Sequence, residues 1–182
     1  AFEFLAEKRP ESAHLVFCTS NIKPEQAFEV AHFLECSTLK SQQREKAVVE
    51  FLEYCVYERK LTETEVHHKL ISTYLSIILA NTDAEQRSQY VMIKDEKEPL
   101  KAYREGLKRV IIESHSYHAL SFCSKFPPIL TEERLLINAR AGNYGACIGI
   151  LCLDIPKQVV LDFCDFVVEK YPEIYTDLIA KL

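Results

Sequence analysis

The sequence predicts an all-α fold, an α-solenoid of antiparallel helix hairpins with about twelve helices, and three observations support this prediction. Apolar residues recur at helical spacing along nearly the whole chain, whereas alternating apolar and polar runs of strand type are absent. Only 4 glycines occur among 182 residues, which is few for the tight turns of an all-β protein. The connections between apolar segments are a few residues long, which favours antiparallel neighbouring helices.

The apolar stripes predict the core. The predicted core positions are Ala47, Val48, Phe51, Leu52, Cys55, Val56, Val66, Leu70, Ile71, Tyr74, Leu75, Ile78, Leu107, Val110, Ile111, Val160, Phe163, Cys164 and Val167. The predicted helices cover 1–8, 11–19, 24–36, 43–59, 63–80, 83–94, 98–114, 116–124, 131–141, 143–153, 156–170 and 173–181.

Local signals mark where several helices begin. Residues 62–65 and 82–85 have the Thr-x-x-Glu pattern of a capping box, in which both side chains bond to otherwise unpaired backbone N–H groups. Pro127 and Pro128 should end whatever helix precedes them. The prolines expected in first helical turns are Pro24, Pro156 and Pro172.

Composition excludes several classes of protein. A net charge of −5 and the lack of a dense Lys/Arg cluster argue against nucleic acid or direct lipid binding. The 7 cysteines are an odd number and most lie in apolar runs, which indicates buried reduced thiols of a cytoplasmic protein. No apolar run reaches the ~18 residues of a membrane span. Because the chain begins at Ala1, we interpret residues 1–182 as a single segment of a longer or processed chain.

Five histidine and cysteine residues are the candidate metal ligands. His67 and His68 are adjacent, so on a helix their rings point about 100° apart and cannot easily face one metal. We expect one to pack or cap at a hairpin junction and the other to be solvated. His115 and His118 have i, i+3 spacing, and Cys123 could supply the further ligand that zinc needs, although a structural role is favoured.

Cys147 is the cysteine with a glycine-rich environment, flanked by Gly142, Gly145 and Gly149. These glycines lack the spacing of a phosphate-binding loop, so we expect them to allow a neighbouring helix to approach closely. The acidic segments 94–98 and 131–133 are predicted to be a solvated stretch and a helix start. We therefore expect no catalytic residue, cofactor or metal, and no enzymatic activity.

The stretch 131–154 resembles the helical hairpin of the vacuolar-sorting tethering subunits of the HOPS and CORVET complexes, of the TGF-β-receptor-associated type, which are related to clathrin heavy-chain repeats. The positions that match the family pattern are Glu132, Glu133, Arg134, Gly142 at the turn, Ile150 and Asp154. Cys147 and Ile148 stand where the family has Ala-Leu, and Phe163-Cys164 stands where it has Tyr-Cys. A second match lies in 47–75, where a helix is followed by a loop and then by a second helix. The matching residues of this second helix are His68, Leu70, Tyr74 and Leu75. In this resemblance the histidine is a packing residue of a hairpin.

The resemblance implies a scaffold whose mechanism is binding. The family tethers endosomal and lysosomal or vacuolar membranes before fusion, and its partners are the other tethering subunits and Rab-type GTPases. The implied location is cytoplasmic, with peripheral association with those membranes. Two alternatives stay open: a self-contained helical adaptor or effector domain that binds a peptide or small GTPase, and a metal-dependent helical enzyme. A closed helical bundle is the alternative architecture.

Overall fold

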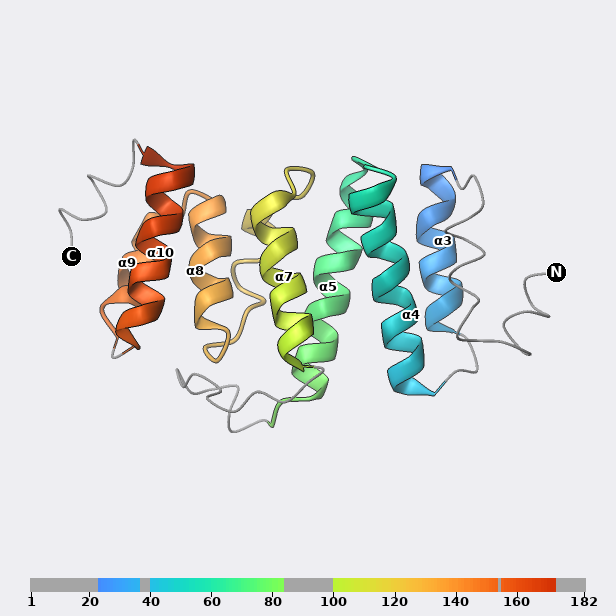
Figure 1. Cartoon of the computed structure of the whole chain (residues 1–182), viewed down its shortest axis with the longest axis horizontal. Coiled ribbons are helices and arrows are strands. Elements are labelled where there is room, and N and C mark those ends of the chain that lie inside the picture. Colours follow the sequence, from blue (N-terminus) through green and yellow to red (C-terminus); the bar gives the residue numbers. More distant parts are fainter. Residues whose placement is uncertain (1–22, 37–39, 84–99, 154, 173–182) are drawn as a thin grey trace. The chain divides into compact units, whose positions relative to one another are not determined.

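Within residues 23–36, 40–83, 100–153 and 155–172, which the computed structural model describes, every regular element is helical (Figure 1). The elements are α3 (Pro24–Glu35), α4 (Ser41–Glu53), the π-helical turn η1 (Tyr54–Glu58), α5 (Thr64–Ala80), α7 (Leu100–Glu113), the 3-10 turn η2 (Ala119–Ser121), α8 (Thr131–Arg140), α9 (Tyr144–Leu151) and α10 (Lys157–Lys170). The prediction of an all-α fold is confirmed for this part of the chain.

The chain divides into two compact units. The first boundary follows Ile77, within α5, where the sequence shows no sign of a domain boundary. The first unit contains α3, α4, η1 and most of α5, together with Ser114–Tyr117. The second unit contains the end of α5 and α7 through α10.

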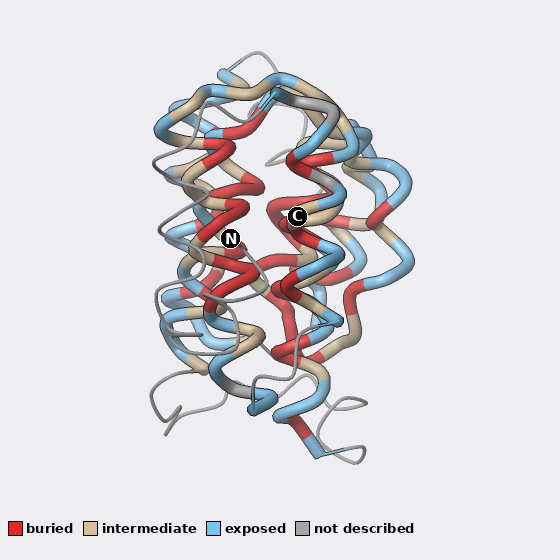
Figure 2. Tube along the Cα trace, turned by 90° about the vertical axis from the view of Figure 1, so that its right-hand side faces the viewer, coloured by how far each residue is buried: buried red, intermediate tan, exposed pale blue. Residues whose placement is uncertain are grey.

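In the first unit, α3 packs on α4, and each of them makes a polar contact with α5. Lys69 of α5 lies 2.7 Å from a carboxylate oxygen of Glu35 in α3. The Tyr74 hydroxyl donates a hydrogen bond of 2.6 Å to Glu53 in α4. The predicted stripes of α4 and α5 are buried, and Figure 2 shows buried positions recurring along the helices. The helical period therefore identified the part of the core that α4, η1 and α5 contribute, but not the buried Ala27, Ala31 and Leu34 of α3.

In the second unit, α8 is central, because it contacts α7, η2, α9 and α10. Its core includes Leu135 and Ala139 from α8, Cys147 from α9, and Phe163 and Val167 from α10. These side chains are buried where α8 packs its apolar residues against α9 and α10.

The buried face of α10 differs from the prediction by one position. Val159 is buried at 3% exposure, whereas Val160 and Cys164 are only half-buried. Adjacent valines fit a helical period almost equally well, so packing against α8 and α9 decides which one is buried.

The predicted helix at 116–124 is wrong, because only the short turn η2 forms there. Leu120 is 71% exposed, so the apolar pattern of this segment does not face the core. The two prolines at 127 and 128 also lack the N–H groups that would continue a helix.

The predicted helix 43–59 is present, but its last turn is π-helical. The Arg59 N–H donates to the Tyr54 carbonyl at 3.0 Å, five residues earlier, which widens the turn while Cys55 and Val56 stay buried. Lys60 then adopts a φ of 52°, in the left-handed region, as the chain leaves the helix.

The helix starts follow the sequence signals in part. Pro24 is the first residue of α3, as predicted. Pro156, in contrast, lies just before α10 rather than in its first turn. The helix α5 begins at Thr64, one residue later than a capping box at Thr62 predicts. The Thr82 hydroxyl donates to the Ile78 carbonyl at 2.7 Å and so closes the end of α5. The predicted helices 1–8, 11–19 and 173–181, most of 83–94, and the acidic stretch 94–98 lie outside the described residues.

Candidate functional site

His67, in the first turn of α5, is a buried and fully hydrogen-bonded histidine. It is 4% exposed, its Nε2 lies 2.7 Å from the Leu61 carbonyl oxygen, and its Nδ1 lies 2.7 Å from the Ser114 hydroxyl. A carbonyl can only accept, so Nε2 carries the hydrogen and donates it to Leu61. The Ser114 oxygen, the partner of Nδ1, also accepts a bond of 3.3 Å from the Ser116 N–H.

These contacts assign His67 a structural role. It joins the loop before α5 to the segment that follows α7, and both ring nitrogens have protein partners. Its neighbour His68 is half-buried rather than solvated. His67 is thus the buried histidine of the pair, while His68, which the resemblance selected as the packing residue, is partly buried.

The histidines of the proposed zinc site do not share a helix face. His115 lies in the non-helical segment after α7, and His118 immediately precedes η2, so the i, i+3 argument does not apply to them. The Cys123 thiol is directed to the carbonyls of Ala119 and Ile137 at 3.6 and 3.9 Å. Among the described residues, no group of three His, Cys, Asp or Glu side chains could hold a metal ion.

The turn between α8 and α9 depends on Gly142, which has a φ of 70° that side chains rarely tolerate. Beside it, the buried Asn138 accepts a side-chain hydrogen bond of 3.0 Å from Asn143 and donates one of 2.8 Å to the Arg134 carbonyl. This network fixes the path of the chain through the turn.

The prediction for the other glycines is wrong. A Cβ atom added at Gly145 or Gly149 would meet nothing within 4 Å, so no helix in the described part of the chain approaches them. Both are exposed, because α9 turns Cys147, Ile150 and Leu151 toward the core instead.

Cys147 is a buried thiol of low reactivity. Its Sγ lies 3.6 Å from the Leu135 carbonyl, and burial, together with the nearby Cys123, raises its pKa from 9.0 to about 12. The six described cysteines are free thiols, of which Cys36 and Cys152 are exposed.

We expect iodoacetamide at pH 8 to alkylate Cys36 and Cys152 well before Cys147 in the folded chain. A thiol with a pKa near 12 has about a thousandfold less thiolate at this pH than one at 9.0, and thiolate is the reacting form. Peptide mass spectrometry over time measures the order of labelling. In denaturant all three should react at similar rates, and early labelling of Cys147 without denaturant would contradict the assignment.

The acidic start of α8 forms ion pairs that the sequence analysis did not identify. Glu133 is fully buried and accepts two hydrogen bonds from Arg104 of α7, at 2.7 and 2.9 Å. Glu132 accepts one of 2.9 Å from Lys108. The sequence did contain a signal, because Arg104 occupies the same helical stripe as the apolar Leu107 and Ile111.

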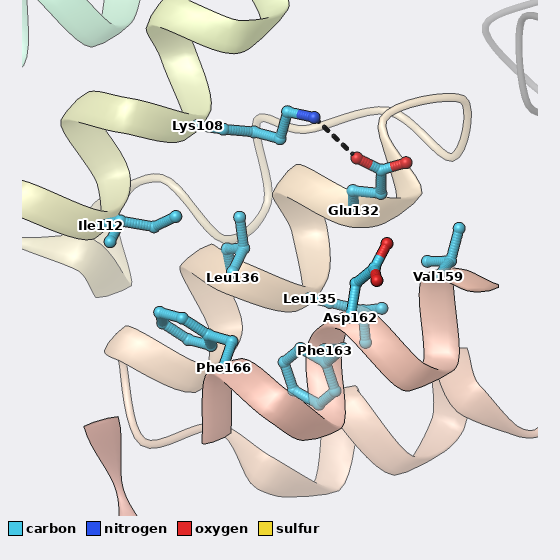
Figure 3. A pocket seen from close by; sticks show the side chains of 9 residues that line it. All are labelled: Lys108, Ile112, Glu132, Leu135, Leu136, Val159, Asp162, Phe163 and Phe166. Atoms are coloured by element: carbon cyan, nitrogen blue, oxygen red, sulfur yellow. Dashed lines mark hydrogen bonds and ion pairs between the residues drawn. The ribbon is translucent and has the colours of Figure 1, made fainter. Parts of the chain in front are cut away.

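A groove lies beside these ion pairs, between α7, α8 and α10 of the second unit. It encloses about 190 Å³ and is open to solvent. The residues that line it are Lys108, Ile112, Glu132, Leu135, Leu136, Val159, Asp162, Phe163 and Phe166 (Figure 3). Its interior is thus apolar, and its charged groups come from three helices.

The charges at the groove are predominantly negative. Lys108 is held between Glu132 at 2.9 Å and Glu105 at 2.8 Å. Burial lowers its pKa, but the hydrogen bonds to Glu105 and Glu132 and the charges of Glu132 and Glu133 outweigh burial and raise the pKa above its ordinary value. Asp162 accepts a hydrogen bond of 2.7 Å from the neutral amide of Gln158, and no cation among the described residues pairs with it.

Comparison with known proteins identifies no relative: no family model, curated protein or solved structure matches the chain. In the part of the chain that the structure describes, no helix has the length and apolar character needed to cross a membrane.

Proposed function

We propose that the chain is a non-catalytic α-solenoid segment of a multisubunit membrane-tethering complex of the HOPS and CORVET class. In this proposal its partners are sibling subunits and Rab-type GTPases, and it reaches endosomal, lysosomal or vacuolar membranes through them. Stacked hairpins would present partner-binding surfaces along a rod, and several joined contacts would raise the effective concentration of each partner.

The observation that supports the proposal most directly is the conformation of the stretch that carries the resemblance. Residues 131–151 form two contacting helices, α8 and α9, joined by a turn at Gly142. The two glutamates of the Glu-Glu-Arg motif have specific partners on the preceding helix, Glu133 with Arg104 and Glu132 with Lys108. Such contacts between successive helices are what a stack of hairpins requires.

The test is reconstitution of the purified chain with individual HOPS and CORVET subunits and with Rab-type GTPases. We expect a stable complex with at least one subunit on size-exclusion chromatography, and an elongated particle by small-angle X-ray scattering. Failure to bind any subunit would contradict the tethering role. A compact, near-spherical particle would contradict the solenoid.

The groove favours a second candidate function, a self-contained helical adaptor that binds a peptide. An adaptor of this kind would be compact and would bind its peptide without any tethering subunit. The same two measurements therefore separate the two candidates.

A further inference from the structure

We propose that the groove between α7, α8 and α10 is a docking site for a peptide segment of a partner protein. The segment would insert one large apolar side chain, such as phenylalanine or leucine, and place a lysine or arginine beside Asp162. This inference is independent of the tethering role, because it rests on the second unit alone.

The size of the groove selects a single side chain. Pockets for metabolites and cofactors usually enclose about 300 to 1,000 Å³. The groove, at about 190 Å³, is smaller. An apolar cavity of about 150 Å³ already accommodates benzene, so one aromatic or branched aliphatic side chain fits well.

The interior of the groove suits that side chain. Leu136 and Phe163 provide buried apolar surface, and the half-buried Ile112 and Phe166 provide surface that water still reaches. Figure 3 shows both phenylalanine rings of α10 facing the side chains of α8. A side chain that covers this surface would stabilise the complex through the hydrophobic effect.

The charges select the flanking residue. Of the charged side chains that line the groove, Lys108 contributes one positive charge, while Glu132 and Asp162 contribute two negative charges. Lys108 already has two carboxylate partners, whereas among the described residues Asp162 has the amide of Gln158 alone. A basic side chain on the partner would complement this excess of negative charge, and an acidic one would be repelled.

The experiment uses the full chain with ¹³C-labelled methyl groups and three synthetic heptapeptides. The peptides carry Lys-Phe-Lys, Glu-Phe-Glu or Lys-Ala-Lys at the centre of a Gly/Ser sequence. We expect the first to shift the methyl signals of Ile112, Leu136 and Val159 saturably, with a dissociation constant of about 1 mM, since a single side chain supplies most of the contact. The other two should bind at least about fivefold more weakly.

Two matched variants test the charge at Asp162. Asp162→Lys should weaken the Lys-Phe-Lys peptide about fivefold, because it replaces an attraction with a repulsion. Asp83→Lys makes the same substitution at an exposed position that does not line the groove and should change binding less than twofold. Both positions are exposed, so we expect both variants to fold. Methyl signals outside the groove that match those of the parent chain would verify this.

Several outcomes would overturn the proposal. One is equal binding of the Lys-Phe-Lys and Glu-Phe-Glu peptides, and another is the absence of shifts at the three methyl groups. A third is a change in those signals on deletion of residues 173–182, which would identify the chain's own segment as the occupant. Dependence of the signals on protein concentration would instead identify a second copy.

Discussion

Replacing Glu133 by glutamine should lower the free energy of unfolding by about 3 to 5 kcal/mol, the usual cost of breaking a buried ion pair on one side. The Glu133 side chain is fully buried and that of Arg104 is 10% exposed, so water can replace little of the lost interaction. The variant keeps the shape of the side chain but leaves the guanidinium charge uncompensated. Chemical denaturation followed by circular dichroism measures the loss, and hydrogen exchange locates it in α7 and α8.

Two further variants make this prediction specific. Glu105→Gln removes a carboxylate that is 61% exposed and should cost less than about 0.5 kcal/mol. The double variant Arg104→Met/Glu133→Leu replaces both charges with apolar side chains of similar size and should recover most of the stability. A loss below about 1 kcal/mol in Glu133→Gln, or a double variant no more stable than the single one, would show that the pair is not isolated from water.

Sequence periodicity predicted the core where one apolar stripe dominates a long helix. In α4 and α5, residues such as Phe51 and Ile71 are fully buried, as the spacing requires. The same reasoning failed at 116–124, where Phe122 is buried but its neighbour Leu120 is exposed. A short segment between a histidine-rich stretch and two prolines offers too few positions to define a period.

The polar contacts were harder to predict, because they join residues distant in the sequence. Arg104 and Glu133 are 29 positions apart, and Ser114 and His67 are 47 apart. In each case one partner nevertheless lies in an apolar stripe: Arg104 with Leu107, and His67 with Leu70 and Ile71. A polar residue in such a stripe indicates a buried partner without identifying it, and the groove could not be predicted at all, because it depends on how three helices pack.

Replacing His67 by leucine should lower the free energy of unfolding by about 2 to 4 kcal/mol, because two polar groups each lose their hydrogen bond to the ring. The Leu61 carbonyl would lose its bond to Nε2, and the buried Ser114 hydroxyl would lose its bond to Nδ1. Leucine is similar in volume to the imidazole side chain, so the loss measures hydrogen bonding more than packing. Denaturant titration of the full chain provides the measurement.

A double-mutant cycle identifies the physical origin of this loss. Because Ser114→Ala removes the hydroxyl that bonds to Nδ1, His67→Leu/Ser114→Ala should cost less than the sum of the two single variants. His32→Leu changes a histidine whose side chain is 69% exposed and should alter stability by less than about 0.5 kcal/mol. Additive losses would show that His67 and Ser114 act separately. If a metal chelator destabilised the parent chain as much as His67→Leu does, the histidine would instead be a ligand, and its structural role would have to be abandoned.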